Sequence, residues 1–232
     1  MEQRDVAKEA AREPEGKGNR RVFGYGEAVF DIAYLVAALG TGISILSKGT
    51  GGPRGLAGAM ALLLAFGDAF HLLPRIGAIL TGDTPRFHRA LGFGKLVTSI
   101  TMTVFYVLLW HLGTLLVPAV PQGWTALAWA LAALRIALCL FPQNGWYATD
   151  PSFGWALLRN IPFFLLGIQA IVLFFLHRAV IAPLHWMWLA AALSFAFYLP
   201  VALWVGKNPK LGMLMLPKTC MYLWMLGMLA GL

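Results

Sequence analysis

Residues 56–80, LAGAMALLLAFGDAFHLLPRIGAIL, run for 25 positions with one acidic and one arginine side chain. A helix needs about 20 mostly apolar residues to cross about 30 Å of hydrocarbon. Six more stretches of this kind lie at 27–47, 94–116, 122–141, 157–177, 183–205 and 211–231. The sequence therefore predicts an all-α integral membrane protein built as a bundle of about seven transmembrane helices.

The composition of the whole chain favours the same class. Of its 232 residues, 59% are hydrophobic and 12% are charged, where a soluble domain has about 45–50% and about 25%. The connections between the apolar stretches are short, which leaves no room for a separate water-soluble catalytic domain. Residues 23–232 are therefore expected to form a single transmembrane domain whose function lies in or at the bilayer.

The basic residues predict an orientation. Residues 1–22 hold six Lys or Arg and five Asp or Glu without an apolar core, so we expect a flexible charged tail and no signal peptide. The tail and the second and sixth connections carry twelve Lys or Arg, and the other side carries three. This asymmetry places the N-terminus in the cytoplasm and the C-terminus outside, and a bacterial inner membrane fits the short loops. It also explains the net charge of +8 without a nucleic-acid partner.

No cofactor or metal is expected. Cys139 and Cys220 lie inside apolar stretches, with no CxxC or other metal-type spacing, so both are interpreted as small buried hydrophobes. Lys218 in the last stretch raises the possibility of a retinal Schiff base. That chemistry needs a carboxylate counter-ion, usually on the third span, but residues 96–116 contain no Asp or Glu.

Ionisable side chains within the apolar stretches are the main functional candidates, because burying charge in a membrane is costly. They are Asp31, Asp68, His71, Arg135 and Lys218. The expected topology places all five in the cytoplasmic half of the bundle, which predicts a polar pocket open to the cytoplasm. The structural alternative is a set of stabilising pairs, Asp31 with Lys218 and Asp68 with Arg135.

Three of the charged residues share a helix face. Asp68, His71 and Arg75 are spaced i, i+3 and i+7, and a carboxylate beside an imidazole can act as acid and base. Arg75, next to Pro74 at the end of the stretch, is expected to reach lipid phosphates. We interpret Lys218, with Arg135 and Arg159 as companions, as a site for a phosphate or carboxylate headgroup.

Several segments resemble the lysoplasmalogenase-like (YhhN-type) membrane family. They are LLAFGDAFHLLPR at 63–75, ALGFGKLVTSITMTVFYVLLW at 90–110, LSFAFYLPVALW at 193–204 and LGMLMLPKTCMYLWMLGM at 211–228. Gly67-Asp68 is the distinctive polar element that they share with that family. Members of known activity hydrolyse the vinyl-ether bond of lysoplasmalogens, so the resemblance implies that Asp68 is a catalytic carboxylate.

Two departures from the family bear on this expectation. The family usually has about eight spans, against seven here, and its second acidic residue falls near Tyr198 and Leu199. If two acids are required, the chain is inactive on that substrate or uses His71 or Asp31 instead.

The sequence leaves three functions open: a lysolipid hydrolase that uses Asp68, a small transporter or binding protein for an anionic or amphiphilic solute, and a non-catalytic membrane scaffold. The expected partners are membrane lipids and an amphiphilic small molecule. The sequence does not predict the oligomeric state.

Overall fold

The computed structural model describes residues 2–117, 120–148, 151–206 and 208–232, and describes side chains from Gly24 onward except at Pro209. Within these ranges the chain forms seven α-helices and two short 3-10 helices, and no β-strand. The α-helices are α1 (Glu2–Ser47), α2 (Gly52–Thr81), α3 (Thr84–Leu116), α4 (Gln122–Leu140), α5 (Phe153–Leu176), α6 (Met187–Trp204) and α7 (Met215–Leu229). The 3-10 helices are η1 (Pro142–Asn144) and η2 (Pro209–Leu214).

Each of the seven α-helices, α7 together with the end of η2, is long and apolar enough to cross a membrane. The seven apolar stretches of the sequence therefore form the seven predicted helices. The starts of some spans differ from the prediction: α3 begins at Thr84, before the predicted 94, and α6 begins at Met187, after the predicted 183, because residues 183–186 form bends and turns. Pro183 has no backbone N–H to continue a helical ladder, which agrees with a later start.

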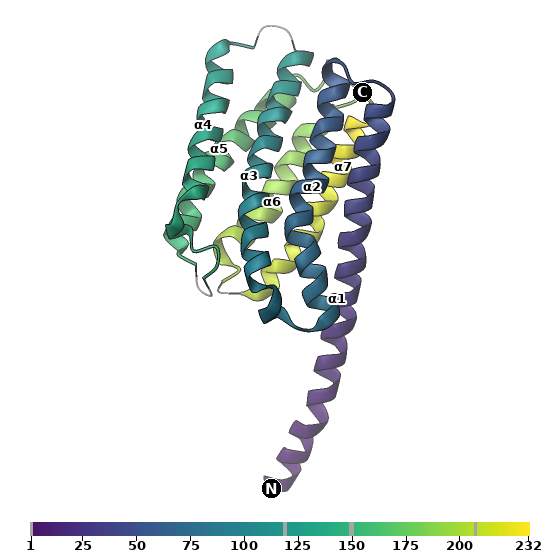
Figure 1. The fold of residues 1–232 in the computed structure, drawn as a ribbon, viewed down its shortest axis with the longest axis vertical. Helices are drawn as coiled ribbons and strands as arrows, with labels where there is room; N and C mark the ends of the chain where they lie inside the picture. Colours follow the sequence, from purple (N-terminus) through teal and green to yellow (C-terminus); the bar gives the residue numbers. More distant parts are fainter. Residues whose placement is uncertain (1, 118–119, 149–150, 207) are drawn as a thin grey trace.

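The helices run alternately up and down, so the two ends of the chain lie at opposite ends of the bundle (Figure 1). We call the end where α1 enters the N-terminal end. The α2–α3, α4–α5 and α6–α7 connections lie there too. Which end faces the cytoplasm stays a prediction. Residues 2–22, predicted as a flexible tail, continue α1 beyond the bundle (Figure 1), and their side chains lie outside the described residues.

Neighbouring helices pack in chain order and α7 closes against α1, while α3 also contacts α5. The contact between α2 and α3 depends on small residues. A Cβ added to Gly94 would lie 2.4 Å from the Phe70 carbonyl oxygen, and one added to Gly67 would lie 2.3 Å from Thr101 Oγ1. Such residues let helix backbones approach closely in membranes. This contact fixes the height of Asp68 and His71 relative to α3.

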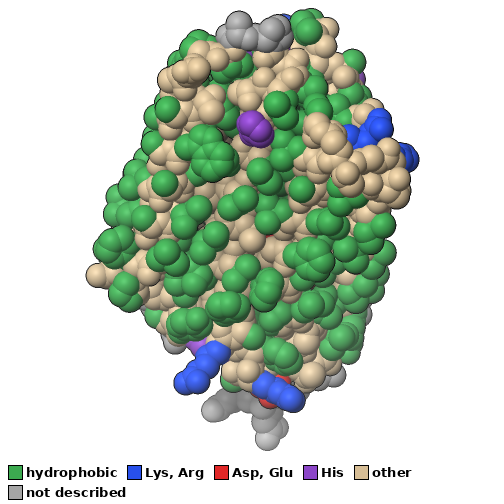
Figure 2. Space-filling view, turned by 45° about the horizontal axis from the view of Figure 1, so that its top comes forward, with side chains coloured by type: hydrophobic (Ala, Val, Ile, Leu, Met, Phe, Trp, Pro, Cys, Tyr) green, Lys and Arg blue, Asp and Glu red, His purple; other side chains and the backbone are tan. Residues whose placement is uncertain are grey.

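The outer surface of the bundle is largely apolar. Large hydrophobic side chains are exposed on every span, for example Val36, Phe66 and Leu134. Figure 2 shows one such face, covered mainly by hydrophobic side chains, with Lys and Arg at its edges. A soluble protein rarely exposes apolar surface on this scale. The chain is therefore a polytopic membrane protein whose exterior faces lipid.

Candidate functional site

A carboxylate and a phenol meet between α1 and α2 in the N-terminal half of the bundle. Tyr34 is buried, and its hydroxyl donates to Asp68 Oδ2 over 2.6 Å. Asp31 lies one turn before Tyr34 on α1 and is 5% exposed. Among the described residues, Asp31 Oδ2 has no hydrogen-bond partner. The structure therefore places Tyr34 against Asp68, with Asp31 near enough to Asp68 for the two charges to interact.

The sequence predicts that His71 pairs with Asp68, and the structure gives Asp68 the Tyr34 hydroxyl as its partner instead. The buried His71 Nδ1 has no hydrogen-bond partner within the described part of the chain. A spacing of i and i+3 places two side chains on one helix face, but it does not require that they touch. The direct carboxylate–imidazole contact is therefore absent, although both groups remain in the same region of α2.

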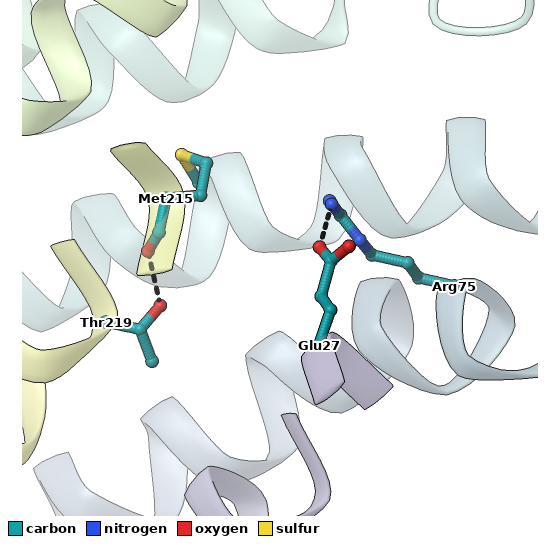
Figure 3. A network of polar contacts seen from close by, with 4 residues as sticks. All are labelled: Glu27, Arg75, Met215 and Thr219. Atoms are coloured by element: carbon teal, nitrogen blue, oxygen red, sulfur yellow. Dashed lines mark hydrogen bonds and ion pairs between the residues drawn. The ribbon is translucent and has the colours of Figure 1, made fainter. Parts of the chain in front are cut away.

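Arg75 lies at the N-terminal end of this region. Its guanidinium donates to the Glu27 carboxylate across the gap between α1 and α2, and Figure 3 shows the two side chains pointing toward one another. Figure 3 also shows the nearby Met215 and Thr219 of α7, where the Thr219 hydroxyl donates to the Met215 carbonyl. The structure gives Arg75 a carboxylate partner on the neighbouring helix, and the expected contact with lipid phosphates stays a prediction.

Lys218 lies at the start of α7 and is 9% exposed. Its Nζ lies 4.5 Å from the centre of the Tyr222 ring and 5.6 Å from that of the Tyr198 ring. In the described ranges it makes no hydrogen bond or ion pair, and Glu27 and Arg75 form the one salt bridge found there. Lys218 is therefore a buried cation held by aromatic faces, with no direct ion pair in the described ranges, although Asp68 is near enough for the two charges to interact.

Arg135 on α4 is 2% exposed and forms no ion pair with a carboxylate in the described ranges. One guanidinium nitrogen donates to Asn160 Oδ1 over 3.1 Å and to the Arg159 carbonyl over 3.3 Å. The guanidinium lies over the Phe163 ring at 3.7 Å. The pairs considered from sequence, Asp31 with Lys218 and Asp68 with Arg135, are therefore not formed. Asp68, Arg135 and Lys218 instead contact other polar or aromatic groups on neighbouring helices.

Arg135 and Lys218 are nonetheless connected. The Tyr198 hydroxyl donates to Asn160 Oδ1, which is also the acceptor for Arg135, and the Tyr198 ring faces Lys218. This short network crosses from α4 through α5 and α6 to α7. Tyr198 occupies the place where the resemblance implied a second acid, and it acts here as a link between two cations.

Arg159 lies near the start of α5 and contacts the α4–α5 connection. It donates to Asn144 Oδ1 over 2.8 Å and lies over the Trp146 ring at 4.3 Å. Asn144 Nδ2 in turn donates to carbonyls at the end of α4, including that of Leu138 at 2.7 Å. Arg159 is therefore engaged in holding a helix end and its connection.

Several polar residues of the site escaped the sequence analysis. Tyr34, Asn160, Tyr198 and Tyr222 are uncharged, and a search limited to ionisable residues in spans passes over them. The position of Tyr34, three residues after Asp31 on the same helix face, was the available signal. No sequence feature indicates the ring contacts of Lys218, because they join two different helices.

Two cavities are described, and neither is lined by Asp31, Asp68, His71, Arg135 or Lys218. One, of about 460 Å³, lies between α3, α4 and α5 toward the C-terminal end. The other, of about 590 Å³, lies at the opposite end beside Arg89, Phe93 and Tyr147. Within the described residues, no group of three or more His, Cys, Asp or Glu side chains could hold a metal ion.

No family model, no curated protein and no solved structure matches this chain.

Proposed function

We propose that this protein hydrolyses a single-chain vinyl-ether lipid in the N-terminal half of the bundle, with Asp68 as the acid and base. The observation that carries this proposal is a group of polar atoms that lack protein partners. In the described part of the chain, Asp31 Oδ2 and His71 Nδ1 have no hydrogen bond, and Lys218 forms no ion pair. Buried polar groups are nearly always satisfied, so these atoms favour a site that is completed by a ligand or water.

The arrangement around Asp68 suits protonation of a vinyl ether. A protonated Asp68 gives its proton to the outer carbon of the C=C bond, and positive charge develops on the other carbon and on the ether oxygen. The resulting carboxylate stabilises this cation electrostatically. Water then adds to the cationic carbon and returns a proton to Asp68. The hemiacetal breaks its bond to the glycerol oxygen, which takes the hydroxyl proton, and the products are a fatty aldehyde and an alcohol.

Asp31 replaces the missing second acid in this proposal. It lies one turn from Tyr34, near enough to Asp68 for the two charges to interact, and a second carboxylate adds to the stabilisation of the cation. His71, one turn along α2 from Asp68, offers a ring nitrogen that can hold the attacking water. Tyr34 acts as a positioning residue, because its hydroxyl fixes the orientation of the Asp68 carboxylate.

Lys218 supplies the contact for an anionic headgroup. It forms no ion pair among the described residues, whereas Arg135 donates to Asn160 and Arg159 donates to Asn144. The two arginines therefore contribute mainly by holding α4 and α5 in place. Two charge pairs considered under the scaffold hypothesis, Asp31 with Lys218 and Asp68 with Arg135, are not formed.

The test is aldehyde release from a lysoplasmalogen by the purified protein in lipid nanodiscs. We expect turnover by the unchanged chain and a loss of about 10²- to 10⁴-fold in Asp68→Asn, which removes the proton donor. The saturated 1-alkyl lysolipid is the control substrate, since it has no C=C bond to protonate. Asp83→Asn is the matched control variant, because Asp83 caps α3 and Asn is an equally good cap.

Two outcomes would contradict the proposal. Full turnover in Asp68→Asn removes this carboxylate from the chemistry. No turnover by the unchanged chain, together with lysolipid binding that weakens in Lys218→Met but not in Lys48→Met, identifies a binding or transport protein for an anionic amphiphile. Lys48 is an exposed residue in the α1–α2 connection and so controls for loss of charge.

A further inference from the structure

The cavity between α3, α4 and α5 has no role in the proposed hydrolysis. It has a volume of about 460 Å³ and lies in the C-terminal half of the bundle, within the range of about 300–1,000 Å³ usual for small-molecule sites. Its lining comes from the end of α3, the start of α4 and the second half of α5, and includes Trp110, Leu131 and Leu173. It is therefore separate from the site around Asp68.

The lining of this cavity is continuous with the lipid-facing surface. Leu127, Ile168 and Val172 line the cavity and are also among the large exposed hydrophobic residues of the bundle. All three lie in membrane-spanning segments of α4 and α5. A molecule can therefore enter sideways from the bilayer, and the hydrocarbon chain of a membrane amphiphile matches the chemistry of most of the lining.

One polar side chain lines this otherwise apolar cavity at membrane depth. Gln169 on α5 is 6% exposed, and its amide nitrogen donates to the Trp124 carbonyl. Its Oε1 accepts no hydrogen bond from any residue that the structure describes. A buried amide oxygen without a donor costs about 1–3 kcal/mol. A ligand that carries a hydrogen-bond donor would remove this cost.

The lining also restricts the charge of the ligand. Among the described residues that line the cavity there is no Asp, Glu, Lys or Arg. His177 lies at the end of α5, and its Nδ1 is within hydrogen-bonding distance of the Leu173 carbonyl. Transfer of an ionised group to an apolar site without a partner is strongly unfavourable. The cavity is therefore suited to a neutral headgroup and not to a phosphate.

We infer that this cavity binds a neutral single-chain lipid, with its hydrocarbon chain in the groove between α4 and α5 and a hydroxyl donating to Gln169 Oε1. The class is that of monoacylglycerols and long-chain alcohols. This site differs in chemistry from the one around Lys218, where a buried cation forms no ion pair in the described ranges. The inference does not rest on the proposed hydrolysis, and either can fail alone.

The experiment uses a monoacylglycerol with a photoactivatable diazirine in its acyl chain, added to the full chain in phosphatidylcholine nanodiscs. After irradiation, labelled peptides are mapped by mass spectrometry. We expect labelling to concentrate on α4 and α5 residues that line the cavity. Leu131→Trp, which fills the cavity, should reduce labelling at least fivefold. Leu134→Trp should leave it unchanged, because Leu134 lies on the same helix, is 52% exposed and does not line the cavity.

Competition on the unchanged chain tests the hydrogen bond without any variant. Monooleoylglycerol should compete roughly two- to tenfold better than its dimethyl ether, which is the ratio given by about 0.5–1.5 kcal/mol for one hydrogen bond. A lysophosphatidylglycerol should compete poorly. In Gln169→Leu the preference for the free hydroxyl should disappear while labelling persists.

Three results would overturn the inference. They are equal labelling of Leu131→Trp and Leu134→Trp, labelling scattered over all seven helices, and equal competition by the hydroxyl and methyl-ether compounds on the unchanged chain. Equal competition by the lysophospholipid would exclude the neutral class and with it the proposed ligand.

Discussion

Substitution of Gly94 by Ala tests the close packing of α2 against α3 that positions the site. An added Cβ would lie 2.4 Å from the Phe70 carbonyl oxygen and 2.6 Å from the His71 Cα, where ordinary contacts begin at 3.4 Å. The shortfall is therefore about 1 Å. Both neighbouring atoms belong to the backbone of α2, so no side-chain rotation relieves the clash and the two helices must separate.

Overpacking of this kind costs about 1–3 kcal/mol. A chain of this size changes its melting temperature by about 2–4 °C for each kcal/mol, so a cost of about 2 kcal/mol predicts a fall of roughly 4–8 °C. The matched control is Gly40→Ala on α1, where an added Cβ meets nothing within 4 Å. Alanine is favoured over glycine in a helix by about 0.5–1 kcal/mol, so the control should be equally or slightly more stable.

The assay is thermal unfolding of both purified variants in the same detergent, followed by intrinsic fluorescence and by the loss of the monodisperse peak on size exclusion. Equal melting temperatures for Gly94→Ala and Gly40→Ala would refute the argument, because the helices would then tolerate a wider separation at no cost. If Gly94→Ala lowers the melting temperature and also impairs lysoplasmalogen turnover, the height of α2 relative to α3 matters for the site.

Two further predictions concern the partner of Asp68 and the orientation of the chain. Tyr34→Phe removes the hydroxyl that donates to Asp68. Because this partly buried carboxylate then lacks a hydrogen bond, the stability measured by thermal unfolding should fall by about 1–3 kcal/mol. Tyr25→Phe, at a half-exposed side chain, should leave the stability unchanged. In a background without native cysteines, a membrane-impermeant maleimide added to intact cells should label Thr50→Cys but not Arg86→Cys; the reverse pattern would invert the predicted topology.

The number and positions of the spans were predictable because one physical quantity decides them. An apolar run of about 20 residues matches the thickness of the hydrocarbon layer, and no distant contact is needed to recognise it. The shared depth expected for Asp31, Asp68, His71, Arg135 and Lys218 rests on the alternating direction of the spans and stays a prediction. Both inferences use only distances along the chain.

The partners of these residues were not predictable, because they depend on which helices meet and on how each is rotated. Tyr34 and Asp68 are 34 residues apart, and Glu27 and Arg75 are 48 apart. The cavity beside Gln169 was also invisible in the sequence. Leu and Val line a groove and face lipid with equal ease, so only the packing of α4 against α5 distinguishes the two roles.

The surroundings of Lys218 impose the strongest energetic constraint on the function. A lysine at the centre of a span costs about 2.5–3.5 kcal/mol on insertion scales, and a cation over an aromatic ring recovers about 0.5–2 kcal/mol. Asp68 is near enough for its charge to interact with that of Lys218, but in the described ranges no carboxylate forms a direct ion pair with it. A methionine of similar length would pack in the same place without this cost. An unpaired cation is thus a poor way to hold helices together, and an anionic headgroup is the partner that offsets its burial. This argument favours a ligand at Lys218 whether the chain cleaves that ligand or only binds it.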